Sequence, residues 1–305
     1  MKKLPVVGST ASTTQFCATE IEGPDGTSLW LDGNQKITAG NGTYDEPMPN
    51  AFSLEAQAVV DREREGYSEA SGYERESDHC PGSTPTCRKS CYVHGLEKHA
   101  KTTYELYRHN STEIRKILAS APLFYHWSVI MADHISANCK GGFRWHVSGD
   151  VFSAEYAQWI AAVCRRSPDV QHWIYTRSFA PEILGPLFTV STVNGGNLAL
   201  NLSCDKDNFN EAMLAADYFQ NTSDQESLRL CYLVEAADPI VPPDLKATTD
   251  VIFPDYDLRP RAVEDPTAHP WWASLTLAQR KMVCPVDAFN KSETRRCGPC
   301  SRCLT

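Results

Sequence analysis

Short apolar runs alternate with helical segments through the middle of the chain, and this alternation limits the fold more than any other feature. Strands are expected at residues 143–147, 170–175, 198–203, 228–234 and, more briefly, 251–253. Helices are expected between them at residues 154–166, 181–188 and 208–219. Such alternation forms parallel sheets, because each helix returns the chain to begin the next strand in the same direction. We therefore predict an α/β fold with a partial or full β/α (TIM-like) barrel, whose ligands gather at the carboxyl ends of the strands.

Three regions follow from this pattern. Residues 1–77 are rich in Gly, Thr, Asp and Asn and are expected to form an irregular N-terminal region. Residues 78–255 contain a cysteine loop and the barrel core, with helices expected at 97–120 and 122–137 before the first clear strand. Residues 256–305 begin as a Pro-rich linker and end as a small cysteine-rich, cluster-binding segment.

Charge and apolar patterning exclude some classes of protein. A net charge of −9 gives no overall positive field for nucleic-acid phosphates, so a nucleic-acid partner is allowed but not indicated. No apolar run approaches membrane-spanning length, and we expect a cytoplasmic protein with no membrane contact. Because cytoplasmic thiols stay reduced, groups of cysteines among the twelve indicate metal ligands rather than disulfides.

The last cysteines have the spacing of a four-thiolate metal site. Cys297, Cys300 and Cys303 are each two residues apart, and Cys284, followed by proline, lies upstream. Two-residue gaps let one turning backbone present three thiolates to a [4Fe-4S] cluster, so iron-sulfur is favoured and zinc is the alternative metal. A site closed by four protein ligands has a structural or an electron-transfer role.

A second group, Cys80, Cys87 and Cys91, has only three cysteines. Three thiolates would leave one iron of a [4Fe-4S] cluster without a protein ligand and open to a small molecule. A zinc site made by these cysteines with His94 or His79 is the competing interpretation. The third ligand of an iron site is therefore left open between Cys80 and His94.

Polar residues follow the first two clear strands at the expected ligand-binding end. The first strand leads into Ser148, Gly149 and Asp150, and the next one ends at Thr176 and Arg177. Small residues let a ligand approach the backbone, while hydroxyl, carboxylate and guanidinium groups hold polar ligands. The alternative is that Asp150, like Ser153, only caps the helix that follows.

The segments HCPGSTPTCRKSCYV, FRWHVSGDVFSAEYAQWIAAVCRRSPDVQHWIYTRS and CP…CGPCSRC together resemble the phage gene product eighty-eight family. The resemblance covers roughly residues 78 to 303 and implies a phage or prophage context without a particular activity. It therefore implies that the protein works in the cytoplasm of the host.

The order of the motifs also resembles that of radical S-adenosylmethionine enzymes. Cys87-x3-Cys91-x2-His94 is similar to their CxxxCxxC loop, with His94 where the third cysteine stands in that family. The resemblance implies that Ser148, Gly149 and Asp150 hold the methionine amine of S-adenosylmethionine. It also implies that Thr176 and Arg177 contact the ribose or carboxylate, and that the terminal cysteines bind an auxiliary cluster.

Two functions follow from the sequence. The first is an iron-sulfur enzyme that uses an open [4Fe-4S] cluster, S-adenosylmethionine and an electron donor on a small-molecule or macromolecular substrate that the sequence does not name. The second is a non-catalytic zinc or iron-sulfur protein that binds a nucleic acid or protein partner. The basic residues that adjoin the cysteines would serve this second function: Arg88, Lys89, Arg295, Arg296 and Arg302.

Overall fold

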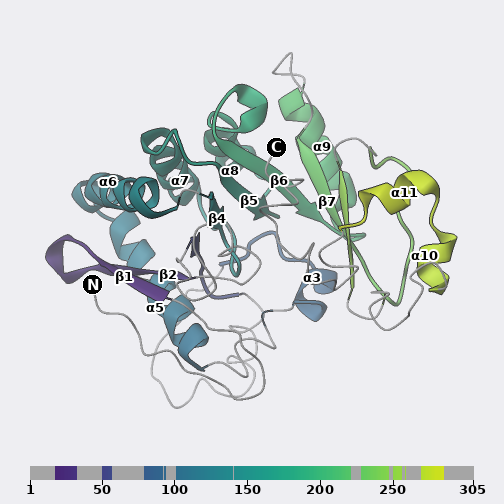
Figure 1. Cartoon of the computed structure of the whole chain (residues 1–305), viewed down its shortest axis with the longest axis horizontal. Coiled ribbons are helices and arrows are strands. Elements are labelled where there is room, and N and C mark those ends of the chain that lie inside the picture. Colours follow the sequence, from purple (N-terminus) through teal and green to yellow (C-terminus); the bar gives the residue numbers. More distant parts are fainter. Residues whose placement is uncertain are drawn as a thin grey trace.

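One sheet of eight strands organises the chain (Figure 1). The computed structural model describes residues 18–32, 50–56, 79–91, 93, 101–139, 141–220, 228–246, 250–255, 258 and 269–284. The strands are β1 (Ala18–Glu22), β2 (Ser28–Asp32), β3 (Ala51–Phe52), β4 (Phe143–Trp145), β5 (His172–Thr176), β6 (Leu198–Cys204), β7 (Arg229–Val234) and β8 (Val251–Pro254).

The strands lie side by side in the order of the sequence, from β1 to β8. The first three pair antiparallel, whereas every pairing from β3 to β8 is parallel. The protein is therefore a mixed α/β protein with a mostly parallel sheet. All strands predicted between residues 143 and 253 are confirmed, with shifts of a few residues at their ends.

A closed barrel is not confirmed. Among the described strands, β1 and β8 are the two ends of the sheet, and no pairing joins them. Val283 forms a parallel bridge with Ile252, so the chain lengthens the sheet beyond β8 instead of closing it. Neighbouring strands that follow one another in sequence are also found in β/α barrels, which explains why the sequence pattern suggests one.

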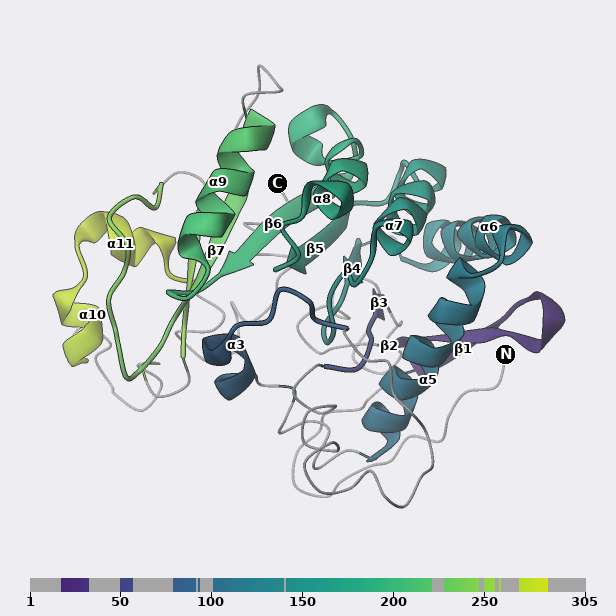
Figure 2. The same ribbon diagram turned by 180° about the vertical axis from the view of Figure 1, so that it is seen from behind.

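Helices cover one side of the sheet. In both views α6, α7 and α8 run along this side, while the short helix α3 lies on the other (Figures 1 and 2). The helices are α3 (Pro85–Lys89), α5 (Lys101–Leu118), α6 (Ala121–Asn138), α7 (Ala154–Arg166), α8 (Pro181–Phe188), α9 (Phe209–Gln220), α10 (Pro270–Ser274) and α11 (Leu277–Met282). The predicted bounds of α7 and α8 are correct at both ends, and those of α9 differ by one residue.

Aromatic side chains bind β3 and β4 to α7. Trp145 contacts Phe143 edge-on with ring centroids 5.0 Å apart, and Trp159 of α7 lies 5.9 Å from Trp145. Phe52 of β3 completes the cluster at 6.3 Å from Trp145, and all four side chains are fully buried. Burial of each such side chain contributes roughly 1.5–3 kcal/mol, so this cluster fixes the first parallel pair beneath its helix.

Helix α7 begins where its sequence indicates. The Ser153 hydroxyl accepts a hydrogen bond from the amide of Tyr156 at 3.2 Å, which caps one of the free amides of the first turn. Arg165 and Arg166 stand in the last turn, where positive charge favours the carboxyl end of a helix. The interpretation of Ser153 as a helix cap is therefore confirmed.

The N-terminal region is more regular than its turn-rich sequence predicts. Residues 18–32 form the β1–β2 hairpin, whose turn contains Pro24–Gly26, and β3 joins this hairpin to the parallel strands. Leu29 and Leu31 alternate along β2 and are fully buried in the main core. Period-two alternation of apolar residues marks this strand even though its short length makes it hard to recognise.

A buried carboxyl group holds the end of β2 against its neighbours. Asp32 Oδ2 accepts hydrogen bonds from the Ser53 hydroxyl and the Tyr107 hydroxyl, both at 3.1 Å. Burial raises the pKa of Asp32 from 3.8 to about 6, although these two hydrogen bonds act in the opposite direction. The fold therefore favours the protonated form of this side chain.

This raised pKa predicts how stability depends on pH. Between pH 4 and pH 6 the folded state binds the proton of Asp32 more tightly than the unfolded state, so the free energy of unfolding falls as pH rises through this window. Asp32→Asn should remove up to about 3 kcal/mol of that fall, as measured by denaturant unfolding from pH 4 to pH 7. The exposed Glu22→Gln is the control, and a variant profile parallel to that of the wild type would contradict the prediction.

Candidate functional site

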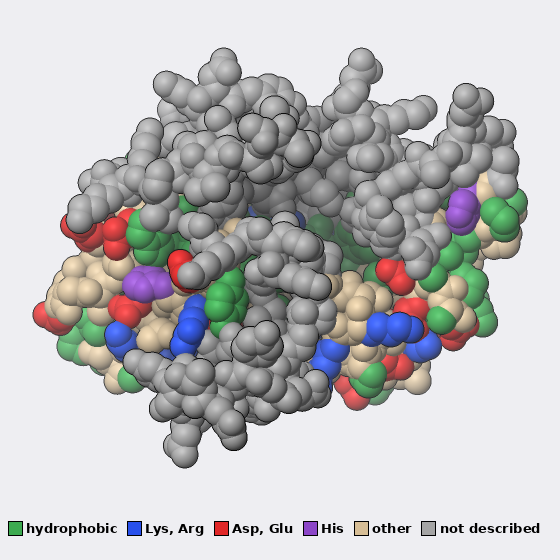
Figure 3. Space-filling model, turned by 90° about the horizontal axis from the view of Figure 1, so that it is seen from below, with side chains coloured by type: hydrophobic (Ala, Val, Ile, Leu, Met, Phe, Trp, Pro, Cys, Tyr) green, Lys and Arg blue, Asp and Glu red, His purple; other side chains and the backbone are tan. Residues whose placement is uncertain are grey.

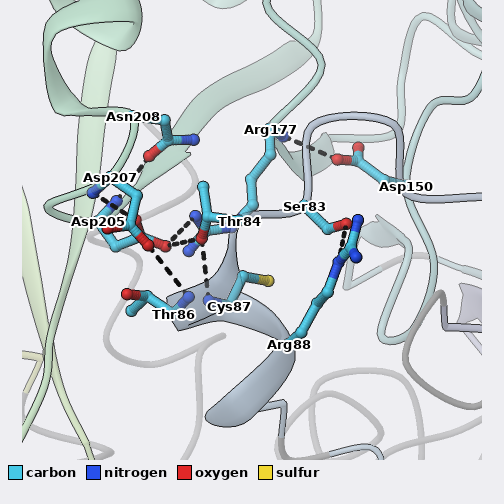
Figure 4. A network of polar contacts seen from close by, with 10 residues as sticks. All are labelled: Ser83, Thr84, Thr86, Cys87, Arg88, Asp150, Arg177, Asp205, Asp207 and Asn208. Atoms are coloured by element: carbon cyan, nitrogen blue, oxygen red, sulfur yellow. Dashed lines mark hydrogen bonds and ion pairs between the residues drawn. The ribbon is translucent and has the colours of Figure 1, made fainter. Parts of the chain in front are cut away.

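The segment that carries Cys80, Cys87 and Cys91 is bound to the carboxyl ends of β4 and β6 (Figure 4). The amide of Asp150, beyond β4, donates to the carbonyl oxygen of His79 at 2.9 Å. The Thr84 hydroxyl donates to Asp205 Oδ2, beyond β6, at 2.5 Å. The cysteine segment therefore lies at the end of the parallel sheet where ligands of α/β proteins gather.

Helix α3 positions Cys87 within this segment. The Thr84 hydroxyl caps the helix by accepting the Cys87 amide at 2.9 Å, and Pro85 occupies the first helical position. The Thr86 amide donates to Asp207 Oδ2 at 3.1 Å, which adds a second tie to the loop after β6. Cys91 follows Cys87 by four residues, which is about one helical turn.

Two glycines allow the backbone segments to approach one another. A Cβ atom on Gly82 would collide with the carbonyl oxygen of Arg177, just beyond β5. Gly149 has a φ of +80°, and a Cβ atom there would come within 2.6 Å of Leu54 Cβ. The missing side chain at Gly149 thus allows the close approach of the chain that leaves β3, and its predicted contact with a ligand stays a prediction.

A buried ion pair lies at the centre of the site. Arg177 Nη1 and Asp205 Oδ2 are 2.6 Å apart, and the Asp205 side chain is fully buried. Asp205 Oδ1 accepts the Asp207 amide, and the Asp205 amide donates to Asn208 Oδ1, both at 2.9 Å. A buried carboxylate needs such additional donors, because ion pairing alone does not offset the loss of hydration.

The electrostatics link this ion pair to Cys87. Burial disfavours the charge on the guanidinium, but Cys87 and Asp205 together raise the pKa of Arg177 above its usual value. Burial raises the pKa of the Cys87 thiol, while the nearby Arg177 guanidinium acts in the opposite direction. Arg177 therefore lowers the pKa of this thiol more than Arg88, the other positive charge that acts on it.

Asp150 joins the ends of β4 and β5. Its Oδ2 accepts the Arg177 amide at 2.8 Å, and its Oδ1 accepts the Val151 amide at 2.7 Å. Burial raises the pKa of Asp150 to about 6, against the hydrogen bond from the Thr176 side chain and those from the two amides. The methionine amine of S-adenosylmethionine would have to bind to these oxygens as an additional donor. Its contact with Asp150 therefore stays a prediction.

The hydroxyl groups predicted at this end are buried. Thr176 Oγ1 accepts the Ser178 amide at 3.1 Å. Within the described part of the chain, the hydroxyls of Ser148 and Ser178 are enclosed and have no hydrogen-bond partner. Buried polar groups are nearly always hydrogen-bonded, so these two hydroxyls are available to a ligand or a water molecule.

The predicted metal ligands that the structure describes do not form a ready-made centre. Among the residues that the structure describes, no three side chains of His, Cys, Asp or Glu converge as metal ligands. Arg115 Nη2 donates to His79 Nδ1 at 3.4 Å, and Glu55 Oε2 lies 3.9 Å from His79 Nε2. Both ring nitrogens of His79 thus face other groups, and His94 lies outside the described residues.

The C-terminal group is described only in part. The Cys284 amide donates to the carbonyl oxygen of Ile252 at 2.8 Å, and its buried side chain packs with Cys231 and Val251. The other predicted ligands, Cys297, Cys300 and Cys303, lie outside the described residues. The four-thiolate site therefore stays a prediction whose first member is anchored at the edge of β8.

Thr84 and Asp205 hold the cysteine segment in place, and neither residue was predicted from the sequence. Asp205 could have been found, because it directly follows β6 as Asp150 follows the end of β4. The Thr84–Asp205 hydrogen bond spans 121 residues of sequence, and no local pattern indicates it.

The described residues on the face seen from below have mixed charge. Seen from below, the Lys and Arg side chains of the described residues lie among Asp and Glu side chains on both flanks (Figure 3).

In the part of the chain that is described, none of the helices is both long enough and apolar enough to cross a membrane.

The fold and the site define an α/β protein with a cysteine-bearing segment bound at the carboxyl ends of a parallel sheet. The chain belongs to the gene product 88 family, whose model matches residues 28–305. It is similar to the Gene 88 protein of Mycobacterium phage L5, with 32% identity over 145 residues, and to that of phage D29, with 34% over 139.

These alignments cover 45% and 44% of the chain. They take in 57% and 55% of the two relatives, so the chain spans little more than half of their lengths. No solved structure matches the chain. The family and its phage relatives are thus shown by sequence, while the site has to be interpreted from its own geometry.

The ion pair generates a prediction about how the site is held together. Asp205→Ala should lower the free energy of unfolding by about 3–5 kcal/mol, because it leaves the Arg177 guanidinium buried without its carboxylate. The same change should speed hydrogen exchange in residues 79–91, because this segment loses the hydrogen bond between Thr84 and Asp205. Asp205→Asn keeps one acceptor oxygen, so its free energy of unfolding and its hydrogen exchange should lie between those of Asp205→Ala and the wild type.

Asp217→Ala is the control, because Asp217 is an exposed acid on α9, outside the loop that contacts the cysteine segment. It should change stability and the hydrogen exchange of residues 79–91 little. Equal losses of stability in the Asp205 and Asp217 variants, or hydrogen exchange in residues 79–91 that stays unchanged in Asp205→Ala, would show that the ion pair does not hold the segment.

Proposed function

We propose that this protein is a metalloprotein whose centre forms at the carboxyl ends of β4, β5 and β6, where Cys80, Cys87 and Cys91 bind a [4Fe-4S] cluster. The observation that carries this proposal is the attachment of the cysteine segment to that end of the sheet, through Thr84 and Asp205. Function in α/β proteins concentrates there, because loops from several strands meet at one edge.

The chemistry of the donors fits an iron-sulfur cluster. Cysteine thiolates are the usual ligands of such clusters, and all three sulfur-bearing residues are half-buried, neither fully exposed nor sealed in the core. The Arg177 guanidinium beside Cys87 offsets part of the negative charge that thiolates bring. The sulfurs do not converge as the segment stands, so metal binding would require Cys80 and Cys91 to move toward Cys87, as metal binding that is coupled to folding allows.

Three thiolates would leave one iron free of protein ligands. A cluster of this kind supplies a binding position for S-adenosylmethionine and an electron for its cleavage, and it needs an external electron donor. The chain's own part would be to hold that molecule with the groups at the ends of β4 and β5. Each Asp150 oxygen has a second acceptor position, and the Ser148 hydroxyl is enclosed without a partner among the described residues.

The second part of the proposal concerns the C-terminal cysteines. Cys284, Cys297, Cys300 and Cys303 would form a closed four-thiolate site that binds an auxiliary cluster. Because such a site has no open position, its role would be structural or the transfer of electrons. The proposal also assigns the protein to the host cytoplasm, where thiols remain reduced.

A non-catalytic zinc protein is the second candidate. It is favoured by one observation, that both Asp150 oxygens already accept backbone amides and thereby hold the strands together. In that case the cysteines would hold loops together, and the sheet would bind a nucleic acid or a protein. The mixed charges in Figure 3 and the Arg88 Nε donation to Ser83 at 3.0 Å give little support to a basic nucleic-acid surface.

Metal content tests the proposal first. The protein should be purified without oxygen, and iron, sulfide and zinc should be measured per chain. We expect iron and sulfide in equal amounts, with about half lost in Cys87→Ser and about half in Cys300→Ser, because each change removes a ligand of one cluster. Cys139→Ala, a buried cysteine outside both groups, is the control and should keep the full content. Stoichiometric zinc with negligible iron would sink the iron-sulfur proposal and support the second candidate.

The role of S-adenosylmethionine needs a separate measurement. The electron paramagnetic resonance spectrum of the reduced protein should change when S-adenosylmethionine is added, and the change should be lost in Cys87→Ser but kept in Cys300→Ser. Asp150→Asn keeps one of the two acceptor oxygens and loses the charge, so it should weaken the effect of S-adenosylmethionine without changing iron content. If the spectrum does not change when S-adenosylmethionine is added, the protein still binds iron-sulfur clusters, but the proposal that S-adenosylmethionine is its cofactor is wrong.

A further inference from the structure

The loop between β4 and α7 begins with a histidine that the proposed function does not use. His146 directly follows β4, and its amide donates to the carbonyl oxygen of Phe52 at 2.8 Å. Its φ is +58°, in the left-handed region that residues other than glycine seldom adopt. Backbone outliers of this kind concentrate at functional sites, so the contacts of the His146 side chain decide whether this one has a role.

The partner of His146 is a tyrosine in the first turn of α7. His146 Nε2 and the Tyr156 hydroxyl oxygen are 2.8 Å apart, and both residues are buried. Burial, and then the charge of Arg144, lower the pKa of His146 to about 3. Burial, and then the charge of Asp150, raise the pKa of Tyr156 well above its usual value. Both side chains are therefore neutral at neutral pH.

A count of hydrogen atoms indicates which side chain donates. A neutral imidazole has one N–H group and a tyrosine has one O–H group. If Tyr156 donates to Nε2, the ring proton is on Nδ1 and only this donor is left over. If Nε2 donates instead, the tyrosine proton and the Nδ1 lone pair are both left over. Buried polar groups without partners are costly, so the first arrangement is favoured.

His146 Nδ1 is therefore a donor without an acceptor. Among the described residues it has no hydrogen-bond partner, and the same is true of the Ser148 hydroxyl two residues further along the loop. Each of these residues is 3% exposed, so bulk water does not serve as the partner. Loops that join a parallel strand to the next helix are where α/β proteins bind ligands.

A second buried histidine shows why the position of His146 matters. His172 Nδ1 is also without a partner among the described residues. However, His172 begins β5, so it lies at the opposite end of the parallel strands, and its ring stacks on Trp145 in the core. His146 lies at the ligand-binding end instead, which makes His172 a natural reference for it.

The cysteine segment lies over this loop. The Phe152 ring stacks on the Tyr156 ring with centroids 4.8 Å apart, and the His79 ring meets Phe152 edge-on at 5.7 Å. The Asp150 amide also donates to the carbonyl oxygen of His79 at 2.9 Å. A small molecule would therefore reach His146 when the cysteine segment moves aside.

We propose that the β4–α7 loop binds a small molecule through a neutral carbonyl group, whose oxygen accepts the hydrogen bond from His146 Nδ1. A neutral imidazole does not offset the loss of hydration of a buried carboxylate, so an uncharged acceptor is preferred. The Ser148 hydroxyl, which donates and accepts, offers a second contact in the same loop. This site goes beyond the proposed function, because it depends on His146 and requires no metal.

Nuclear magnetic resonance of the full chain with 15N-labelled histidine tests the site. The 15N chemical shifts should show that the His146 ring proton is on Nδ1. Titration with N-methylacetamide, a small neutral carbonyl compound, should shift the Nδ1 signal of His146 and leave that of His172 unchanged. Acetate, which is similar in size but charged, should leave both signals unchanged.

Two variants of His146 separate the Nδ1 donor from the contact with Tyr156. In His146→Gln the amide reaches Tyr156 in place of Nε2 but offers no donor in place of Nδ1. The dissociation constant for N-methylacetamide, measured from the shifts of backbone amides in the loop, should rise about three- to tenfold, as expected for one hydrogen bond. His146→Asn has an amide donor near the position of Nδ1 and tolerates a positive φ, so it should bind with intermediate affinity.

His126→Gln is the control, because His126 is exposed on α6, and its affinity should equal that of the wild type. Asp205→Asn should bind more tightly than the wild type, because a weaker attachment of the cysteine segment makes its opening less costly.

Three results would overturn the inference. One is a ring proton on Nε2 of His146, which would leave no donor at Nδ1. Another is an Nδ1 signal that N-methylacetamide does not shift, which would mean that a water molecule alone occupies the site. The third is an equal shift at His172, which would mean a general effect of the compound on the protein.

Iron content is measured in the same samples. An iron-free wild type that still binds N-methylacetamide through His146 would remove the cluster proposal and leave this inference intact. An iron-containing wild type whose His146 signal does not respond would remove this inference alone.

Discussion

The ion pair between Arg177 and Asp205 is the interaction on which the arrangement of the site depends. It joins the end of β5 to the end of β6, and Asp205 also accepts the hydroxyl of Thr84, which caps α3. One carboxylate thus fixes two strand ends and the cysteine segment. The energy of this ion pair depends on exclusion from water and on several donors at once. Loss of any one partner would therefore weaken the interactions of the others.

The sheet divides the molecule into two sides with different chemistry. Toward the helices, fully buried aromatic and aliphatic side chains such as Trp145 and Leu202 supply most of the stability. The opposite face combines arginine and asparagine side chains with smaller apolar clusters that include Trp173, Ala199 and Cys231. Parallel sheets in α/β proteins are often apolar on both faces, and this sheet departs from that pattern only in part.

Prediction from sequence succeeded where the signal is local. The helices 154–166 and 181–188 agree with the structure because caps, prolines and apolar periodicity define their ends within a few residues. The N-terminal strands were missed because they are short and lie among turn residues. Barrel closure is not confirmed, because sequence order alone does not decide whether end strands meet.

The sequence by itself determined the order of strands and helices, the alternation that separates the two faces, and the presence of thiol, carboxylate and guanidinium groups after the strands. Only the tertiary structure decided which of these groups meet. Arg177 and Asp205 are 28 residues apart in sequence, and Thr84 and Asp205 are 121 apart. Such pairs form because parallel strands bring their carboxyl ends to one edge, and burial at that edge leaves each polar group with only the partners that the fold supplies.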